Sequence, residues 1–308
     1  MKITVLGWLL VPAIAFQACT ECGLDYRKEE GTVVIAPDWS AFPCPASACY
    51  RFYAAEGGEA VNGDADESAS AGHFSATLPA GGYCLLAYNT DARGVAFAGV
   101  ESRNTAEVCL VSDAQPGDVY TWNVDAVDVP LRSTVQYTPV PRRLVKQMLL
   151  HFEVTGMEEA KVLNGRLNGV YPSVFLLSGE PSEQSMAAAP RTKTEFTVTL
   201  TRAGTRNAEP AYTASADVRL LGMLNPEDGA GYDCRLHLQV RNAVGEAYSA
   251  AVDMNATLTD IISLHEGELP VDETIEVEIG VNLLDMALTA AVRGWTEGSG
   301  EGEVGAYK

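Results

Sequence analysis

Basic residues and histidines are scarce in this sequence. Its 308 residues include 21 Lys and Arg against 41 Asp and Glu, with only 4 His, which gives a formal net charge of −20. The acidic residues are spread along the chain rather than gathered in one block. Because an acidic surface repels the phosphates of a nucleic-acid backbone, we expect no nucleic-acid partner.

A hydrophobic run long enough to span a membrane is also missing. The apolar run from Ile3 to Phe16 is shorter than the ~20 residues that a transmembrane helix needs. It follows Lys2 and precedes the small residue Ala18, which is typical of a secretory signal. The Ala18-Cys19 pair at its end is typical of a lipobox, in which Cys19 is lipidated and becomes the first residue of the mature protein. The alternative is ordinary secretory cleavage, which leaves the Cys19 thiol free.

Catalytic motifs are missing as well. The sequence contains no G-x-S-x-G elbow, no H-E-x-x-H motif and no phosphate-binding loop. His151 and His237 occupy polar-facing positions in strand-like segments, which is typical of solvated side chains. Carboxylates are numerous, but no pair is singled out as a general acid and base. We therefore expect no catalysis, no cofactor and no metal; the weaker alternative is a hydrolase assembled by the fold from two carboxylates or a Cys–His pair.

The seven cysteines suit an exported protein. Lipidation would consume the Cys19 thiol, so the C-x-x-C pattern with Cys22 would be neither a redox pair nor half of a metal site. The even number that remains predicts disulfides of unspecified connectivity. Cys44 and Cys49 are close enough to close a short loop, whereas Cys84 could instead be a buried thiol. The candidate disulfide cysteines are Cys22, Cys44, Cys49, Cys84, Cys109 and Cys234.

Alternating apolar residues and turn signals predict an all-β protein. Strands are expected at 32–39, 49–54, 73–89 and 234–240, among others. In the last of these, Leu236, Leu238 and Val240 alternate with polar residues, so one face is expected to be buried. Only residues 256–263 are expected to form a helical turn.

A proline-bearing stretch at 128–143 indicates a division of the chain. Pro139 and Pro141 stiffen it, and a chain of this length at ~100–200 residues per domain suggests two domains. We expect a lipoprotein signal peptide at 1–18, a tether at 19–30, an N-terminal β-sandwich at 31–138 and a C-terminal β-sandwich at 139–308.

Two features could mark a ligand site, and each has a structural alternative. Asn89, Thr90 and Asp91 follow a strand and could form a binding loop, but Asn and Asp also satisfy backbone groups in turns. Aromatic rings could stack on sugars, although Trp in a β-sandwich more often fills the core. The tryptophans concerned are Trp39, Trp122 and Trp295.

Several short motifs occur in an order that resembles a known family. They are Cys19 with its acidic tether, Asp38-Trp39, LPAGGY at 78–83, Asn89-Thr90-Asp91, VPRRLV at 140–145, FEVTGM at 152–157, LNGVYPSVFLLSG at 167–179 and VRGW at 292–295. Together they resemble the fimbrillin-associated anchor lipoproteins of type V pili and a closely similar family of uncharacterised lipoproteins. The glycine-rich segment 294–308 departs from the pattern, because it offers few apolar positions for a donor strand.

The resemblance implies two transthyretin-like Greek-key β-sandwich domains on a lipidated Cys19, exposed at a gram-negative outer membrane. Stalk subunits of such pili lose a first strand to a trypsin-like protease and accept a partner's strand, whereas an anchor keeps its own. Arg27 and Arg51 flank the first expected strand and are the candidate cleavage sites.

The function expected from this resemblance is to anchor a fimbria-like polymer, or to regulate its assembly, without catalysis. The partners would be a fimbrial subunit, met through β-strand contacts, and outer-membrane lipid, met through Cys19. The alternative is a surface lipoprotein that binds glycan or another nutrient.

Overall fold

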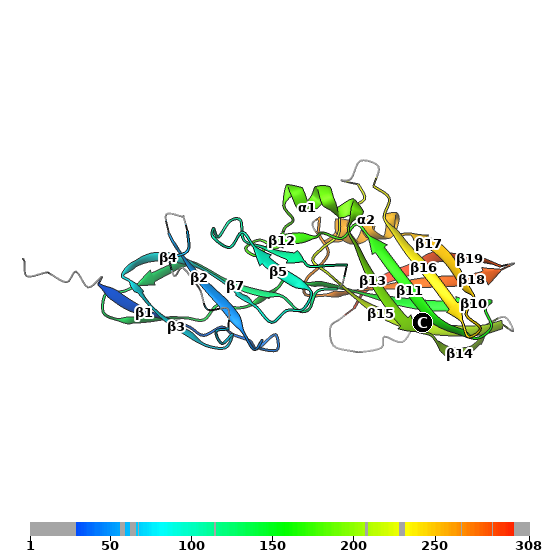
Figure 1. Ribbon diagram of the computed structural model, residues 1–308, viewed down its shortest axis with the longest axis horizontal. Helices are drawn as coiled ribbons and strands as arrows, with labels where there is room; N and C mark the ends of the chain where they lie inside the picture. Colours follow the sequence, from blue (N-terminus) through cyan, green and yellow to red (C-terminus); the bar gives the residue numbers. More distant parts are fainter. Residues whose placement is uncertain are drawn as a thin grey trace, which may run out of the picture.

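The computed structural model describes residues 29–55, 59–61, 66, 68–113, 115–206, 209–227, 232–265, 267–284 and 286–298. Within them strands predominate and the helices are short, so the prediction of an all-β, sandwich-like protein is confirmed. The molecule is elongated, with β1 near one end and the β18–β19 hairpin near the other (Figure 1). No helix in this described part is long and apolar enough to cross a membrane.

Two sheets at the N-terminal end enclose one hydrophobic core. Their strand orders are β3-β1-β8 and β2-β4-β7-β9. The bounds are Glu30–Ile35 for β1, Ala48–Ala54 for β2, Phe74–Pro79 for β3, Gly81–Asn89 for β4, Tyr120–Val129 for β7, Thr134–Tyr137 for β8 and Arg142–Arg143 for β9. In β3, Ala76 and Leu78 face the core while Ser75 and Thr77 face solvent, as the alternation predicts.

Strand β4 is buried on both faces. Leu85 and Ala87 belong to the core between these two sheets, whereas Leu86 and Tyr88 belong to a second core on the opposite face. The sheet β12-β6-β5 contributes Val108 and Val174 to that second core. Its strands are β5 (Val95–Ala98), β6 (Glu107–Leu110) and β12 (Ser173–Phe175). This double burial explains the nearly continuous apolar run of β4.

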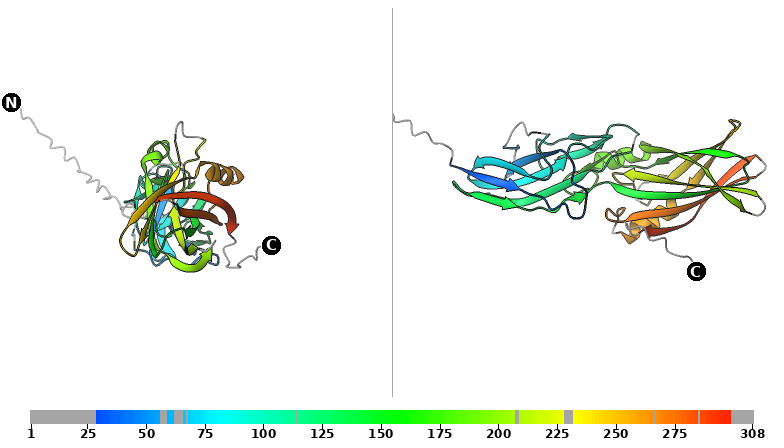
Figure 2. Two further views of the ribbon diagram at one scale, coloured as in Figure 1. Left: turned by 90° about the vertical axis from the view of Figure 1, so that its right-hand side faces the viewer. Right: turned by 90° about the horizontal axis from the view of Figure 1, so that it is seen from below.

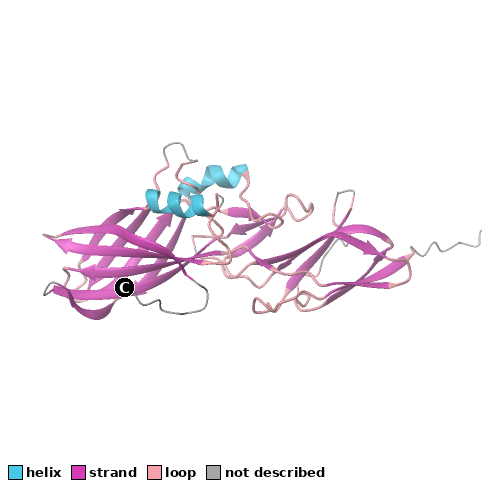
Figure 3. Ribbon diagram, turned by 180° about the vertical axis from the view of Figure 1, so that it is seen from behind, coloured by secondary structure: helices cyan, strands magenta, loops and turns pink. Residues whose placement is uncertain are grey.

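Segments from beyond residue 139 complete these N-terminal layers. Strand β9 pairs with β7, and β12 pairs with β6. Helix α1 (Glu183–Ala188) follows β12 and leads into the turn η1 (Ala189–Arg191), whose Ala189 packs in the second core. Helices α1 and α2 lie on the same side of the molecule (Figure 3). The predicted domain limit at 138/139 stays a prediction. Strands β9 and β12 lie beyond this limit in the sequence but pair with strands that lie before it.

Two larger sheets form the C-terminal part. Their orders are β14-β15-β10-β18-β19 and β13-β11-β16-β17. The bounds are Lys146–Thr155 for β10, Ala160–Asn168 for β11, Lys193–Thr199 for β13, Thr201–Arg206 for β14, Glu209–Leu220 for β15, Arg235–Asn242 for β16, Ala247–Asp253 for β17, Thr274–Leu284 for β18 and Ala287–Gly298 for β19. Strand β17 lies beside β19, and β13 lies beside β15, so the two sheets enclose one core (Figure 2).

The C-terminal core follows the period of two in its strands. In β16, Leu236, Leu238 and Val240 are buried while the residues between them are exposed or half-buried, which confirms the predicted alternation. Helix α2 (Asn255–Leu264) is longer than the predicted helical turn. Its Leu258 and Ile262 are buried in the same core, at the i, i+4 spacing of one helix face.

Candidate functional site

Strand β1, on which the strand-addition hypothesis depends, lies in the middle of its sheet. It pairs antiparallel with β3 and parallel with β8. Val33 and Ile35 are fully buried. Hydrogen bonds continue past its end, where the Ala36 N–H donates to the Tyr137 carbonyl at an N–O distance of 2.9 Å. β1 is therefore a central strand of this fold rather than a loosely added edge.

A glycine lets β1 pass close to the turn after β7. A Cβ at Gly31 would lie 1.9 Å from the carbonyl oxygen of Pro130. The Arg132 N–H donates to the Glu30 carbonyl at 2.8 Å and fixes the same approach. This position therefore excludes any side chain, for a steric reason that a single sequence does not reveal.

Without β1, strands β3 and β8 would border a gap one strand wide. Neighbouring strands lie ~4.8 Å apart, so β3 and β8 stand roughly 10 Å from each other. The floor of the gap would be the apolar residues of the first core, including Leu78 and Leu85. An open sheet with an apolar floor is what β-strand addition requires. In this chain β1 itself occupies that place.

The predicted cleavage site at Arg51 lies inside a paired strand. Arg51 stands opposite Leu86 in the β2–β4 ladder, and its Nε atom is buried. Proteases favour exposed, locally unfolded segments, so β2 would have to separate from β4 before cleavage. Arg27 and the lipidation residue Cys19 lie outside the described residues.

The predicted disulfides stay a prediction. Cys44, Cys84, Cys109 and Cys234 are free thiols, and Cys22 lies outside the described residues. The proposed short loop between Cys44 and Cys49 is not closed: Cys44 is exposed before β2, whereas Cys49 is buried within β2 beside Tyr88. The Cys84 thiol contacts the Asp125 carbonyl at 3.0 Å, and Cys84 is half-buried, whereas the alternative predicted a buried thiol.

Asn89 organises the loops at the end of β4. Its side-chain amide donates to Asp91 at 2.8 Å and to the Asp118 carbonyl at 3.0 Å. Its carbonyl oxygen accepts from the Tyr120 N–H at 2.7 Å. Asp91 also accepts from the Ala46 N–H at 2.9 Å. Because these groups are satisfied inside the protein, the turn interpretation of this cluster describes it better than a binding loop does.

The tryptophans singled out in the sequence, Trp39, Trp122 and Trp295, pack in or against the hydrophobic cores. Trp122 is 1 % exposed, and Trp39 meets it edge-on at a ring distance of 5.1 Å. The indole N–H of Trp39 donates to the Ala71 carbonyl at 3.1 Å. Trp295 is half-buried against the C-terminal core. Every Trp, Tyr and Phe in the described ranges is buried or half-buried, so those residues offer no exposed aromatic platform for a sugar ring.

A Ser–His–Glu arrangement lies on the outer face of the five-stranded sheet. The Nδ1 atom of His151 is 2.9 Å from the Ser215 hydroxyl, and its Nε2 atom is 3.1 Å from Glu276. Ser215 pairs with His151 inside an antiparallel ladder, where backbone N–H groups are engaged in the sheet and do not converge as an oxyanion hole. The arrangement therefore satisfies the imidazole at both nitrogens and lacks the parts of a hydrolase.

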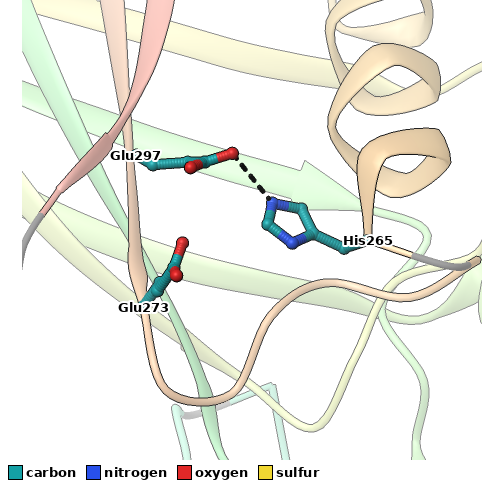
Figure 4. A group of neighbouring side chains, drawn as sticks. All are labelled: His265, Glu273 and Glu297. Carbon is teal, nitrogen blue, oxygen red and sulfur yellow. Dashed lines mark ion pairs between the residues drawn. The ribbon is translucent and has the colours of Figure 1, made fainter.

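One group of described residues could hold a metal ion. His265, Glu273 and Glu297 each place a ligand atom within 4.8 Å of the other two (Figure 4). They come from the end of α2, the residue before β18, and β19. No sequence pattern indicates this group, because its members come from separate segments that meet only in the fold, at the end of α2 and in the pairing of β18 with β19.

No protein-family model matches the chain, and no curated protein matches it. A presumed adhesin from Bacteroides ovatus is 16 % identical with a TM-score of 0.49, over 77 % of this chain and 86 % of that chain. The fimbrial anchor protein Mfa2 from Porphyromonas gingivalis is 10 % identical with a TM-score of 0.46, over 86 % and 98 %. The tip fimbrial protein Mfa3 from Porphyromonas gingivalis, truncated at its C-terminus, is 10 % identical with a TM-score of 0.39, over 87 % and 99 %.

The solved structures that resemble this chain are thus of the kind that the sequence motifs indicated.

Proposed function

We propose that this chain is a non-catalytic, lipid-anchored cell-surface protein that anchors a fimbria-like polymer or regulates its assembly. The observation that carries the proposal is the position of β1. This strand follows the expected tether at 19–30 and is held between β3 and β8 with its apolar side chains in the core. A chain that keeps its first strand presents a closed sheet at the end nearest the membrane, as an anchor would.

The opposite end of the molecule is suited to a protein partner. Three apolar side chains are exposed in the turns there: Val244 by 79 %, Leu284 by 63 % and Met286 by 73 %. The turns lie together, since the Ala243 N–H donates to the Glu159 carbonyl at 3.0 Å and the Tyr248 hydroxyl lies 3.8 Å from the Met286 sulfur. Exposed apolar residues gathered on one surface favour protein contact.

The proposal extends to domains and location. Residues 1–18 are removed as a signal peptide and Cys19 carries the acyl chains. The proposed domains are two transthyretin-like Greek-key sandwiches with a limit near 138/139, and strands β9 and β12 from beyond that limit are added to the N-terminal layers. The protein is exposed at the outer membrane, where two or three acyl chains hold it, since each buried methylene adds ~0.8 kcal/mol. The structures described above as adhesins and as fimbrial anchor or tip proteins are named for roles of this kind.

A Cys19→Ala variant in the native cell tests the anchoring step. We expect the variant to leave the membrane fraction and the polymer to be shed into the medium, because the bond between polymer and membrane is lost. A Cys44→Ala variant is the matched control, since Cys44 is an exposed thiol on the folded part. A polymer that stays on cells carrying Cys19→Ala would contradict the anchoring role.

Co-purification tests the partner. A polymer subunit should co-purify with the intact chain and be lost when residues 32–36 are deleted, provided that circular dichroism shows the C-terminal sheets still folded. If no polymer subunit is captured by the intact chain, the proposal fails. Saccharide binding that protects aromatic rings would instead favour the glycan-binding alternative.

A further inference from the structure

Two carboxylates lie at the core-facing edge of the β18–β19 hairpin. Glu297 stands directly opposite Ile275 in the ladder, so these two side chains belong to one face of the hairpin, and Glu273 lies just before β18 with a carboxylate oxygen within 4.8 Å of a Glu297 oxygen. Ile275 is 1 % exposed and points into the C-terminal core. Both glutamates are therefore directed to the end of the sandwich that α2 covers, rather than to the open face of the sheet.

An imidazole meets them from the other side. Helix α2 ends at Leu264, and His265 is its C-cap residue. The backbone N–H of His265 donates to the Ile262 carbonyl at 3.2 Å. The Nε2 atom of His265 lies 3.4 Å from an oxygen of Glu297. Figure 4 shows the ring directed at the Glu297 carboxylate, with Glu273 on the same side of the ring.

The ring nitrogen is buried without a hydrogen bond. The His265 side chain is 19 % exposed, and its buried Nε2 atom makes no hydrogen bond, although it forms an ion pair with the Glu297 oxygen at 3.4 Å if the ring is protonated. His151 provides the contrast, because both of its nitrogens are within 3.1 Å of a partner oxygen. A buried ring nitrogen without a hydrogen bond is costly unless something else engages it.

No Lys or Arg in the described part of the chain balances the two carboxylates. Among the described residues, no Lys or Arg forms a salt bridge with Glu273 or Glu297; the Lys146 ammonium group pairs with Glu268 instead. The two negatively charged carboxylates repel each other. A divalent cation between them would neutralise their charge and would also coordinate the ring nitrogen of His265.

We propose that His265, Glu273 and Glu297 bind a first-row divalent metal ion, with Zn²⁺ as the best match. Ca²⁺ and Mg²⁺ favour all-oxygen sites, whereas one imidazole with carboxylates suits Zn²⁺, which binds such ligands at about 2.0–2.2 Å. The three ligand atoms lie within 4.8 Å of one another, so small rotations of the two exposed glutamates complete three protein ligands. Water would supply the remaining position.

The ion would act as a clamp. It would join the residue after α2 to the residue before β18 and to β19, and so hold the helix over the end of the C-terminal core. This role concerns the stability of the fold and does not depend on the proposed anchoring function. Because a metal that binds only the folded state stabilises it, the site predicts a stability that rises with Zn²⁺ concentration.

Calorimetric titration of the chelator-treated full chain with ZnCl₂ tests the site. We expect one Zn²⁺ per chain, bound at least about tenfold more weakly by His265→Ala, Glu273→Gln or Glu297→Gln. His151→Ala is the matched control and should bind like the original chain. The titration is run after alkylation of the exposed thiols, so that cysteine does not supply the ligand.

Thermal unfolding gives a second readout that does not depend on heats of binding. Saturating Zn²⁺ should raise the Tm of the chain and of His151→Ala by about 5 °C, and should raise the Tm of Glu273→Gln and Glu297→Gln by no more than about half as much. These two isosteric variants keep the comparison valid if His265→Ala folds poorly. Equal Zn²⁺ binding by all variants, or no uptake by the original chain, would overturn the proposal.

Discussion

At the scale of single residues, buried polar side chains fix the region where β10 begins. The Lys146 side chain is 3 % exposed, and its ammonium group lies 3.0 Å from Glu268 and 3.2 Å from the Leu221 carbonyl. Such contacts join segments that are distant in the sequence, and no local sequence pattern predicts them. For the same reason, the metal-ligand group at His265 could not be predicted from the sequence.

Replacement of Lys146 should destabilise the fold. Lys146→Ala removes the partner of Glu268 and leaves the buried Leu221 carbonyl without this donor, so we expect the free energy of unfolding to fall by about 2 kcal/mol. Lys161→Ala, at an exposed position of β11, is the control and should change it by less than ~0.5 kcal/mol. Urea denaturation measures both. Equal effects of the two variants would show that the contacts of Lys146 do not stabilise the protein.

The thiols should differ sharply in reactivity. Burial raises the pKa of the Cys234 thiol to about 12, whereas Cys44 is exposed. Since the thiolate is the reactive form, iodoacetamide should modify Cys44 in the folded protein and reach Cys234 only after unfolding. Peptide mass mapping locates the modified residues. Early modification of Cys234 in the folded chain would contradict its described burial.

At the scale of elements, the sequence predicted strands well where one face is buried. The alternation in β3 and β16 gave both the strands and their buried faces. Strand β1 ends at Ile35 rather than at the predicted 39, because Pro37 cannot donate to a ladder. Helix α2 was underestimated because its sequence carries Thr and Asp, which favour helices weakly. Pairing between distant segments, such as β12 with β6, leaves no local signal.

The close approach of β1 to the β7–β8 turn gives a test on this element. Gly31→Ala places a Cβ against the Pro130 carbonyl and should destabilise the protein by about 2 kcal/mol through displacement of β1. Gly294→Ala, in β19 with open space around it, is the matched control and should be neutral or slightly stabilising. Thermal and urea unfolding measure the difference. Similar stability of both variants would show that β1 is held less tightly than described.

At the scale of the whole molecule, buried tyrosines set the limit of stability at high pH. Burial raises the pKa of Tyr53 to about 12 and also raises those of Tyr50 and Tyr88. Their folded-state pKa values lie above the unfolded value of ~10. The stability they contribute is therefore complete below about pH 10 and is lost as the pH rises from there toward 12.

Urea denaturation between pH 8 and 11 tests this dependence. These tyrosines should leave the free energy of unfolding unchanged up to about pH 9 and lower it above about pH 10, where the unfolded chain ionises first. Tyrosinate absorbance of the folded protein should rise later than that of the unfolded chain. Ionisation of all tyrosines at the same pH in both states would contradict the described burial.

The anchoring account rests on how the chain is processed at its N-terminal side. The most direct measurement is the intact mass of the mature protein extracted from membranes. The account predicts a chain that begins at a diacylated or triacylated Cys19 and still contains β1. An unlipidated chain that begins after Arg27 would contradict the lipid anchor, although it would keep β1. An unlipidated chain that begins after Arg51 would contradict the account further, because β1 (Glu30–Ile35) would have been cut away.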